Sequence, residues 1–297
     1  MQDSVERVIA NSGRFFGVAC TTTTLVAEAC RRHDVGPTAA VALGRALTGA
    51  VLLAALLKDK QSILLKFEGN GPLRKIITEA GYDGWVRGSI ANPHAEVPLK
   101  NGRIDVAAGI GRAGFLTVTK TIGDSHRYPG TIQLYTSEIG EDIAYYLAHS
   151  EQIPSTIGLA VHLEKDGQVS AAGGFLVQSL PPAEENLLTS LEEEIAALPP
   201  LSSLFLAGKT PAEILSLLFR AIPHRPTGVR PLRYACSCNR KKMAAALLSL
   251  GAAELGELIA SQGSALVRCE FCRQEYTFSA EELTELQRTA SAGTSAP

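Results

Sequence analysis

The chain has 297 residues, and a typical domain length of about 150 residues suggests about two domains. Hydrophobic residues make up 45% and charged residues 20%, a globular composition that excludes a disordered or fibrous protein. The 28 basic and 30 acidic residues give a formal net charge of −2, which excludes a polycationic chain built for nucleic acid or membrane surfaces.

The first 180 residues carry the signals of an α+β domain. An Ala- and Leu-rich run over 39–57 predicts a buried helix, and a β-strand is expected over 63–68. Asn-Gly and Asp-Gly pairs, such as Asp166-Gly167, lie beside β-branched or aromatic runs, which is the pattern of tight hairpins. A second helix is expected over 138–150. We therefore predict a mixed domain with antiparallel hairpins over residues 1–180, not repeated βαβ units.

Residues 181–230 are expected to form an amphipathic helical linker. Eight of the 15 prolines of the chain lie between residues 181 and 231. They bracket two predicted helices, one over 184–198 and one that follows a capping box at Thr210. Short helices interrupted by prolines cannot form a core of their own, so they must dock on a neighbour.

A small cysteine-bearing module is expected over residues 231–288. Residues 243–259 are helical by their Ala and Leu content, with a possible break at Gly251. Residues 267–278 predict a hairpin with two cysteines at its turn. The small, polar residues 289–297 are expected to be a disordered tail.

The six cysteines are unevenly placed. Cys20 and Cys30 lie near the start and are expected to be buried, inert thiols, whereas the other four lie within 236–272. A secreted disulfide scaffold would be shorter and richer in cysteine, and residues 1–14 carry charges instead of an export signal. The apolar run at 39–57 is interrupted by Arg45 and is too short beyond it to span a bilayer. We expect a cytoplasmic protein without a membrane partner, in which paired cysteines favour metal binding or redox chemistry.

The pairs Cys236-Ser-Cys238 and Cys269-Glu-Phe-Cys272 are the strongest chemical signal. Four thiolates suit one tetrahedral Zn²⁺ ion per chain, and with no His or Asp close to either pair the site would be structural. A module of about 55 residues has little core of its own, so loss of zinc should unfold it. The same thiolates can also be oxidised. Four ordinary buried thiols are the alternative.

These cysteine motifs resemble those of the 33 kDa heat-shock protein family of redox-regulated bacterial holdase chaperones. Further segments resemble the family in the expected order: Leu43-Gly-Arg-Ala-Leu-Thr, Gly69-Asn-Gly-Pro-Leu, residues 144–155 and Gly173-Gly-Phe-Leu-Val-Gln. The resemblance implies zinc on Cys236, Cys238, Cys269 and Cys272 in the reduced protein, and Cys236–Cys238 and Cys269–Cys272 disulfides in the oxidised protein. It also implies zinc release, unfolding of the switch domain and linker, a shift from monomer to homodimer, and ATP-independent binding of unfolding proteins under oxidative stress.

Unfolding of the linker would expose its apolar side chains to such client proteins. Each of these residues could instead belong to a permanent core. The candidates for client binding are Leu187, Leu191, Ile195, Leu204, Phe205, Leu217, Leu218 and Phe219.

Other functions have weaker support. A nucleic-acid-binding zinc ribbon is the main alternative, but residues 230–288 carry a net charge of only +1. The run Gly109-Ile-Gly-Arg-Ala-Gly114 matches a dinucleotide motif, yet a β-branched stretch follows it where a helix is required. We interpret it as a glycine-rich turn. Because no nucleophile–base arrangement is present, we do not expect an enzyme.

Overall fold

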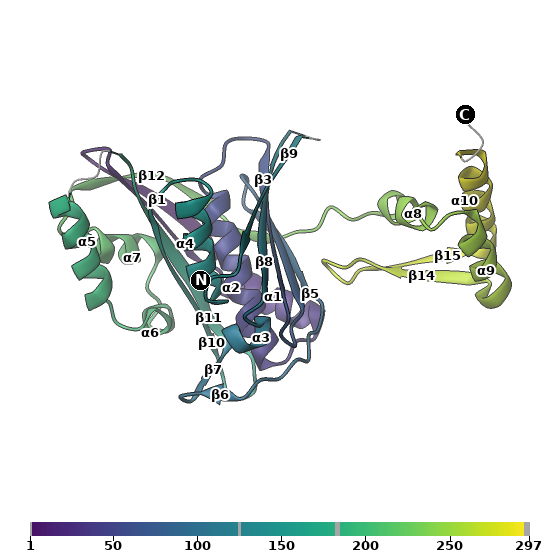
Figure 1. Ribbon diagram of the computed structural model, residues 1–297, viewed down its shortest axis with the longest axis horizontal. Helices are drawn as coiled ribbons and strands as arrows, with labels where there is room; N and C mark the ends of the chain where they lie inside the picture. The colour runs from purple at the N-terminus through teal and green to yellow at the C-terminus, as the bar shows by residue number, and fades with distance from the viewer. Residues whose placement is uncertain (1, 124–125, 182–184, 294–297) are drawn as a thin grey trace. The chain divides into compact units, whose positions relative to one another are not determined.

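The computed structural model describes residues 2–123, 126–181 and 185–293 (Figure 1). The chain divides into two compact units, unit 1 over Met1–Ala235 and unit 2 over Cys236–Pro297. Helices and antiparallel sheets occur in unit 1, and unit 2 carries four of the six cysteines. The predicted α+β class is confirmed.

Two large sheets and one two-stranded hairpin lie in the described part of unit 1. The first has the order β10-β11-β2-β1-β12, and all of its strand pairs are antiparallel. Its strands are β1 (Ser4–Ala10), β2 (Phe15–Thr21), β10 (Ser155–Leu163), β11 (Val169–Ser179) and β12 (His224–Pro231). The second has the order β13-β5-β4-β3-β8-β9 and is antiparallel except for the short β13. Its strands are β3 (Gln61–Gly69), β4 (Lys75–Gly81), β5 (Trp85–Ile90), β8 (Gly114–Ile122), β9 (His126–Gln133) and β13 (Arg233–Tyr234).

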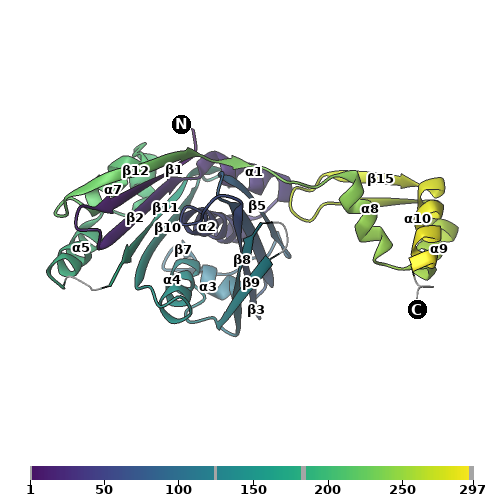
Figure 2. The same cartoon turned by 90° about the horizontal axis from the view of Figure 1, so that it is seen from above.

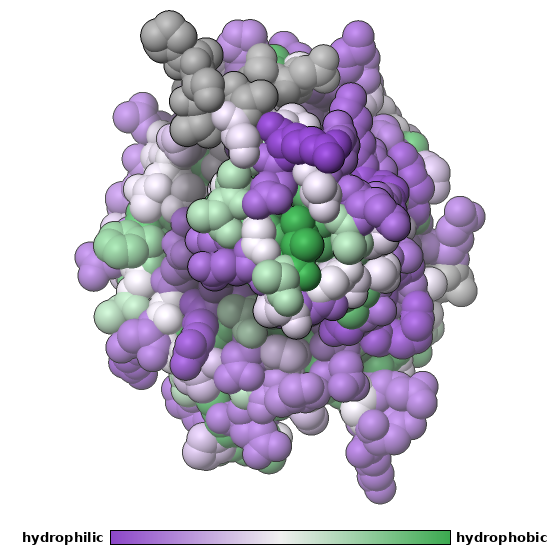
Figure 3. Space-filling model, turned by 90° about the vertical axis from the view of Figure 1, so that its right-hand side faces the viewer, coloured by the Kyte–Doolittle hydropathy of each residue, from purple (hydrophilic) through white to green (hydrophobic). Residues whose placement is uncertain are grey.

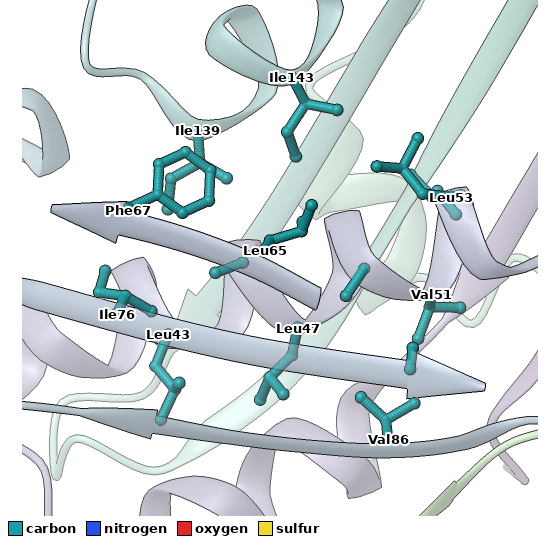
Figure 4. Close-up of a cluster of buried hydrophobic side chains, with 14 of the residues drawn as sticks. Leu43, Leu47, Val51, Leu53, Leu65, Phe67, Ile76, Val86, Ile139 and Ile143 are labelled. Atoms are coloured by element: carbon teal, nitrogen blue, oxygen red, sulfur yellow. The ribbon is translucent and has the colours of Figure 1, made fainter. Parts of the chain in front are cut away.

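Helix α2 (Pro37–Ala54) lies between these two sheets (Figure 2). Leu43, Leu47 and Val51 of this helix lie among buried side chains of the second sheet, and Ile143 joins them from α4 (Figure 4). Alone, α2 is long and apolar enough to cross a bilayer, but 89% of that stretch is buried inside the protein, as expected for a core helix. The remaining elements of this region are α1 (Thr23–His33), α3 (Val106–Ile110), α4 (Ile139–His149) and the hairpin of β6 (Leu99–Lys100) and β7 (Arg103–Ile104).

Three helices cover the outer face of the first sheet: α5 (Glu185–Ala197), α6 (Leu201–Leu206) and α7 (Pro211–Leu218). Strand β2 is apolar on both sides because it lies between two cores. Its Val18 side chain packs in the core around α2, whereas Phe15 and Ala19 pack with the three helices. The predicted linker helices are therefore docked, and the neighbour on which they dock is this sheet.

Two glycine-containing turns meet closely in unit 1. The backbone N–H of Gly71 donates to the Ile110 carbonyl at 2.8 Å, and Gly111 has φ +89°. A Cβ atom at Gly71 would lie 2.4 Å from the Gly109 oxygen. Gly109 lies in α3 and Gly114 begins β8, so the predicted glycine-rich turn is confined to residues 111–113, and a strand follows it, as expected, where a dinucleotide motif needs a helix.

Unit 2 contains three helices and one hairpin. Residues 243–259 do not form one helix, because the chain bends by 108° between α8 and α9 at Gly251, where φ is +90°. Five buried residues form the core of its described part: Leu247, Leu255, Ala265, Phe278 and Leu283. Leu266 remains 60% exposed. The space-filling view of Figure 3 shows a small apolar patch ringed by hydrophilic residues. The elements are α8 (Arg240–Leu248), α9 (Ala252–Gln262), β14 (Ser264–Arg268), β15 (Glu275–Ser279) and α10 (Ala280–Gly293).

The structure differs from the predicted boundaries in two places. Residues 224–231 form strand β12 instead of the end of a helical linker, and the division between the units falls after Ala235, not at 230. Pro226 is tolerated because β12 is an edge strand, opposite a bulge at Arg7 and Val8. Helix α10 continues to Gly293, beyond residue 288, where a disordered tail is expected from the sequence. Residues 294–297 lie outside the described part.

Candidate metal centre

The four cysteines come from two structural contexts in unit 2. Cys236 and Cys238 lie just before α8, whose N-cap Asn239 accepts a hydrogen bond from the Lys242 backbone N–H at 2.9 Å. Cys269 and Cys272 lie in the connection between β14 and β15. The hairpin register brings the ends of these strands together, so the second pair is held at the tip.

All four sulfur atoms lie within 4.8 Å of one another. The Sγ atoms of Cys236 and Cys269 are 3.7 Å apart, and those of Cys238 and Cys272 are 3.3 Å apart. A tetrahedral zinc ion with bonds of about 2.3 Å separates its sulfur ligands by about 3.8 Å. The structure thus brings the four predicted residues together, as cysteines not joined by disulfide bonds, in a cluster that can hold a metal ion such as zinc.

The Cys269–Cys272 turn is organised by its backbone. The Cys269 N–H donates to the Gln274 carbonyl and the Arg273 N–H donates to the Cys269 carbonyl, both at 2.9 Å, while Arg273 has φ 61°. Backbone N–H groups of Phe271 and Cys272 also donate to the Cys269 sulfur. Burial raises the pKa of the Cys269 and Cys272 thiols. The Phe271 and Cys272 amides oppose that shift at Cys269, and the Gln274 amide opposes it at Cys272. A divalent cation would stabilise the thiolates that burial disfavours.

A phenol group contacts the cluster. Tyr276 Oη lies 3.2 Å from the Cys238 Sγ, and this hydrogen bond raises the pKa of Tyr276 to about 12. Sequence analysis places Tyr276 in the hairpin but assigns it no role. Tyr276 lies four residues after Cys272, but it contacts Cys238 of the other cysteine pair. Its sequence position therefore predicts this contact only once the hairpin register is known.

Several basic residues of unit 2 are paired with acidic ones. Arg240 forms an ion pair with Glu282 at 2.6 Å, and Arg268 pairs with Glu275. The Lys242 ammonium donates to the Ser237 hydroxyl at 2.9 Å. The two ion pairs reduce the positive potential that Arg240 and Arg268 offer to phosphate groups, whereas the Lys242–Ser237 hydrogen bond leaves the charge of Lys242 in place.

The other predicted residues lie in unit 1. Cys20 is fully buried and Cys30 is half-buried, and burial raises the pKa of Cys30 to about 12, which is the environment of an inert thiol. The client-binding candidates all lie in the interface between α5–α7 and the first sheet. Leu191, Leu204, Phe205, Leu218 and Phe219 are buried, and Leu187, Ile195 and Leu217 are partly buried. The structure adds the buried Ile214, Leu215 and Ile222 to this interface.

Comparisons with known proteins agree with this organisation. A curated "33 kDa chaperonin" of Desulfotalea psychrophila is 61% identical over 286 residues, which cover 96% of this chain and 97% of the relative. A protein of the same name from Geobacter sulfurreducens is 50% identical, with 98% and 96% covered.

A solved structure is also similar. The crystal structure of a 33 kDa chaperonin from Thermotoga maritima has a TM-score of 0.91 and 34% sequence identity, and the match covers 98% of this chain and 100% of that one. The family model described as "Hsp33 protein" matches residues 3–279. Together with the cysteine cluster, these similarities show that the chain belongs to the Hsp33 family of chaperones.

Proposed function

We propose that this protein is a redox-regulated, ATP-independent holdase of the cytoplasm that binds unfolding proteins under oxidative stress. The observation that carries the proposal is the cluster of four cysteine sulfur atoms within 4.8 Å of one another, in a unit with only a small apolar core in its described part. In the reduced state Cys236, Cys238, Cys269 and Cys272 hold one zinc ion. Bound zinc supplies a cross-link between the hairpin tip and the start of α8, which stabilises the fold of unit 2.

Oxidation reverses this stabilisation. Hydrogen peroxide accepts two electrons from each pair of thiolates and is reduced to water, one S–S bond forms per pair, and zinc is released. The family resemblance supports Cys236–Cys238 and Cys269–Cys272 as the products. The structure also brings sulfur atoms of different pairs close together, Cys236 to Cys269 at 3.7 Å and Cys238 to Cys272 at 3.3 Å, so disulfides between the pairs are the alternative products. Mass mapping of the disulfides distinguishes the two pairings.

The segment that carries α5–α7 responds to the unfolding of unit 2. These helices are short, and their stability depends on docking against the first sheet. When unit 2 unfolds, the segment undocks and its apolar faces, with Leu218 and Phe219 at their centre, become available to clients. Exposed apolar surface also favours association of two copies, so we expect a monomer in the reduced state and a homodimer in the oxidised state.

The decisive experiment measures zinc content and suppression of client aggregation on one sample in three states: reduced, peroxide-treated, and reduced again with zinc present. We expect release of one zinc ion per chain together with a gain of anti-aggregation activity, both reversed by reduction. Size-exclusion chromatography with light scattering follows the oligomeric state in parallel. A gain of activity without zinc release would overturn the proposal.

A further inference from the structure

The hydrogen bond between Tyr276 and Cys238 links the two halves of the cysteine cluster. Tyr276 belongs to β15 of the hairpin, whereas Cys238 lies before α8, and their Oη and Sγ atoms are 3.2 Å apart. A metal-bound or ionised cysteine carries no S–H hydrogen, so the phenol must be the donor whenever the cluster is loaded.

We propose that Tyr276 is a positioning residue of the metal centre, which holds the Cys238 sulfur in place and withdraws electron density from it. This inference rests on the proposed zinc site. A donor hydrogen bond to a coordinating thiolate fixes its rotamer, and such supporting partners typically contribute about 10- to 100-fold to metal affinity. The same bond makes the sulfur a weaker nucleophile toward peroxide.

The packing of the tyrosine ring fixes the direction of its hydroxyl group. Tyr276 is opposite Val267 in the hairpin register, and both side chains pack against the core of unit 2. Phe278, two residues further along β15, shares this face of the strand and lies under the Arg240 guanidinium, 4.4 Å from it. The ring is thus anchored by apolar neighbours while its hydroxyl reaches the sulfur.

The two cysteine pairs are therefore supported by different chemistry. The Cys269 sulfur accepts backbone N–H donors from its own turn, which no side-chain substitution removes. The Cys238 sulfur accepts a side-chain donor from a different element. The Tyr276 hydroxyl can be removed by a single substitution, so its contribution to metal binding can be measured separately.

The test compares full-length wild-type protein with Tyr276→Phe, which keeps the ring and removes the hydroxyl. Competition with a chromophoric chelator should show about 10-fold weaker zinc binding, and peroxide should release zinc several-fold faster. In the Co²⁺-loaded protein, the sulfur-to-cobalt charge-transfer band should move to lower energy, because the sulfur that lost its donor is easier to oxidise. Tyr128→Phe, at a 57% exposed site in unit 1, is the matched control and should leave all three measurements unchanged.

A second variant covers the case in which Tyr276→Phe folds poorly. Site-specific 3-fluorotyrosine at position 276 keeps the shape of the ring but makes the hydroxyl a stronger donor, so the band should move to higher energy. Unchanged bands in both variants, or zinc affinity equal to wild type in a folded Tyr276→Phe protein, would overturn the inference. Failure of the wild-type protein to gain anti-aggregation activity on zinc release would contradict the proposed function instead.

Discussion

The two units of this chain are stabilised in different ways. Unit 1 buries a continuous apolar core around α2, with Leu43, Leu47 and Leu52 fully buried between two sheets, and a second core beneath α5–α7. Unit 2 has five buried core residues in its described part, and it leaves Leu250 and Leu266 exposed by 43% and 60%.

The difference in core size determines how much of each unit's stability depends on a single interaction. A core of the size in unit 2 supplies about 3–5 kcal/mol at most, whereas a structural zinc can contribute about 10–16 kcal/mol of folding free energy. If unit 2 holds zinc as proposed, its fold depends strongly on one interaction, whereas the stability of unit 1 is spread over many contacts. We therefore expect loss of the metal to unfold unit 2 and to leave the core around α2 folded.

Removal of the metal should have the largest effect. We expect a strong chelator, or the Cys269→Ser substitution, to abolish amide protection over residues 240–290, while the protection of α2 stays at its wild-type level. Hydrogen exchange followed by mass spectrometry resolves the two units in one experiment. A chelated protein that retained protection in α8–α10 would show that the core of unit 2 suffices by itself.

The second-largest effects should come from a matched pair of core truncations, one in each unit, which distinguish the stability of unit 1 from metal binding in unit 2. Leu47→Ala removes a fully buried side chain of unit 1 and should cost about 2–5 kcal/mol in its unfolding free energy, with zinc affinity unchanged. Leu255→Ala, equally buried in unit 2, should lower zinc affinity and leave the amide protection of α2 unchanged. If Leu255→Ala also lowered the protection of α2, or Leu47→Ala also lowered zinc affinity, the core around α2 would not be independent of unit 2.

The interface beneath α7 can be perturbed without altering the helices themselves. A Cβ atom at Gly17 would lie 2.6 Å from the Phe219 ring, so Gly17→Ala should weaken docking by about 1–3 kcal/mol. We expect faster hydrogen exchange over 185–222 and partial client binding in the reduced, zinc-loaded protein. Gly140→Ala, where the nearest atom lies at an ordinary 3.5 Å, is the control. Client binding unaffected by a measured loss of protection would exclude this interface as the binding surface.

The cap of α7 should have the smallest effect. The Thr210 side chain accepts from the Glu213 N–H, and hydrogen bonds from Lys209 and Thr210 lower the pKa of Glu213 to about 2. Thr210→Ala should cost about 1 kcal/mol. Because the pKa of Glu213 is lower in the folded state, its contribution is present above about pH 4.5 and is lost as the pH falls toward 2. Stability of the docked segment measured against pH should show this loss, and Thr210→Ala, which removes the hydroxyl donor but keeps Lys209 and the Thr210 backbone N–H, should reduce it in part.

Local signals explain which features the sequence predicts. The Ala- and Leu-rich run at 39–57 and the capping box at Thr210 specify helices by themselves, and the two close cysteine pairs indicate a shared site. Strand β12 is missed because its prolines and glycine suggest a loop, and only its place at a sheet edge makes them acceptable. Tyr276 is missed because its contact with Cys238 depends on three-dimensional register, which residue spacing does not encode.

The position of β12 in the first sheet also determines what release of α5–α7 would leave behind. The segment is anchored at both ends to the same sheet, by β11 before it and β12 after it, and three strand spacings of about 4.8 Å separate these anchors by about 14 Å. Undocked helices would form a tethered loop above the apolar surface they had covered, which includes Phe15, Phe175 and Val177. Release would thus expose two apolar surfaces, one on the helices and one on the sheet. Because the helices stay tethered to the sheet at both ends, their redocking would be an intramolecular step at high effective concentration. The chain could therefore return to its docked state without an external energy source.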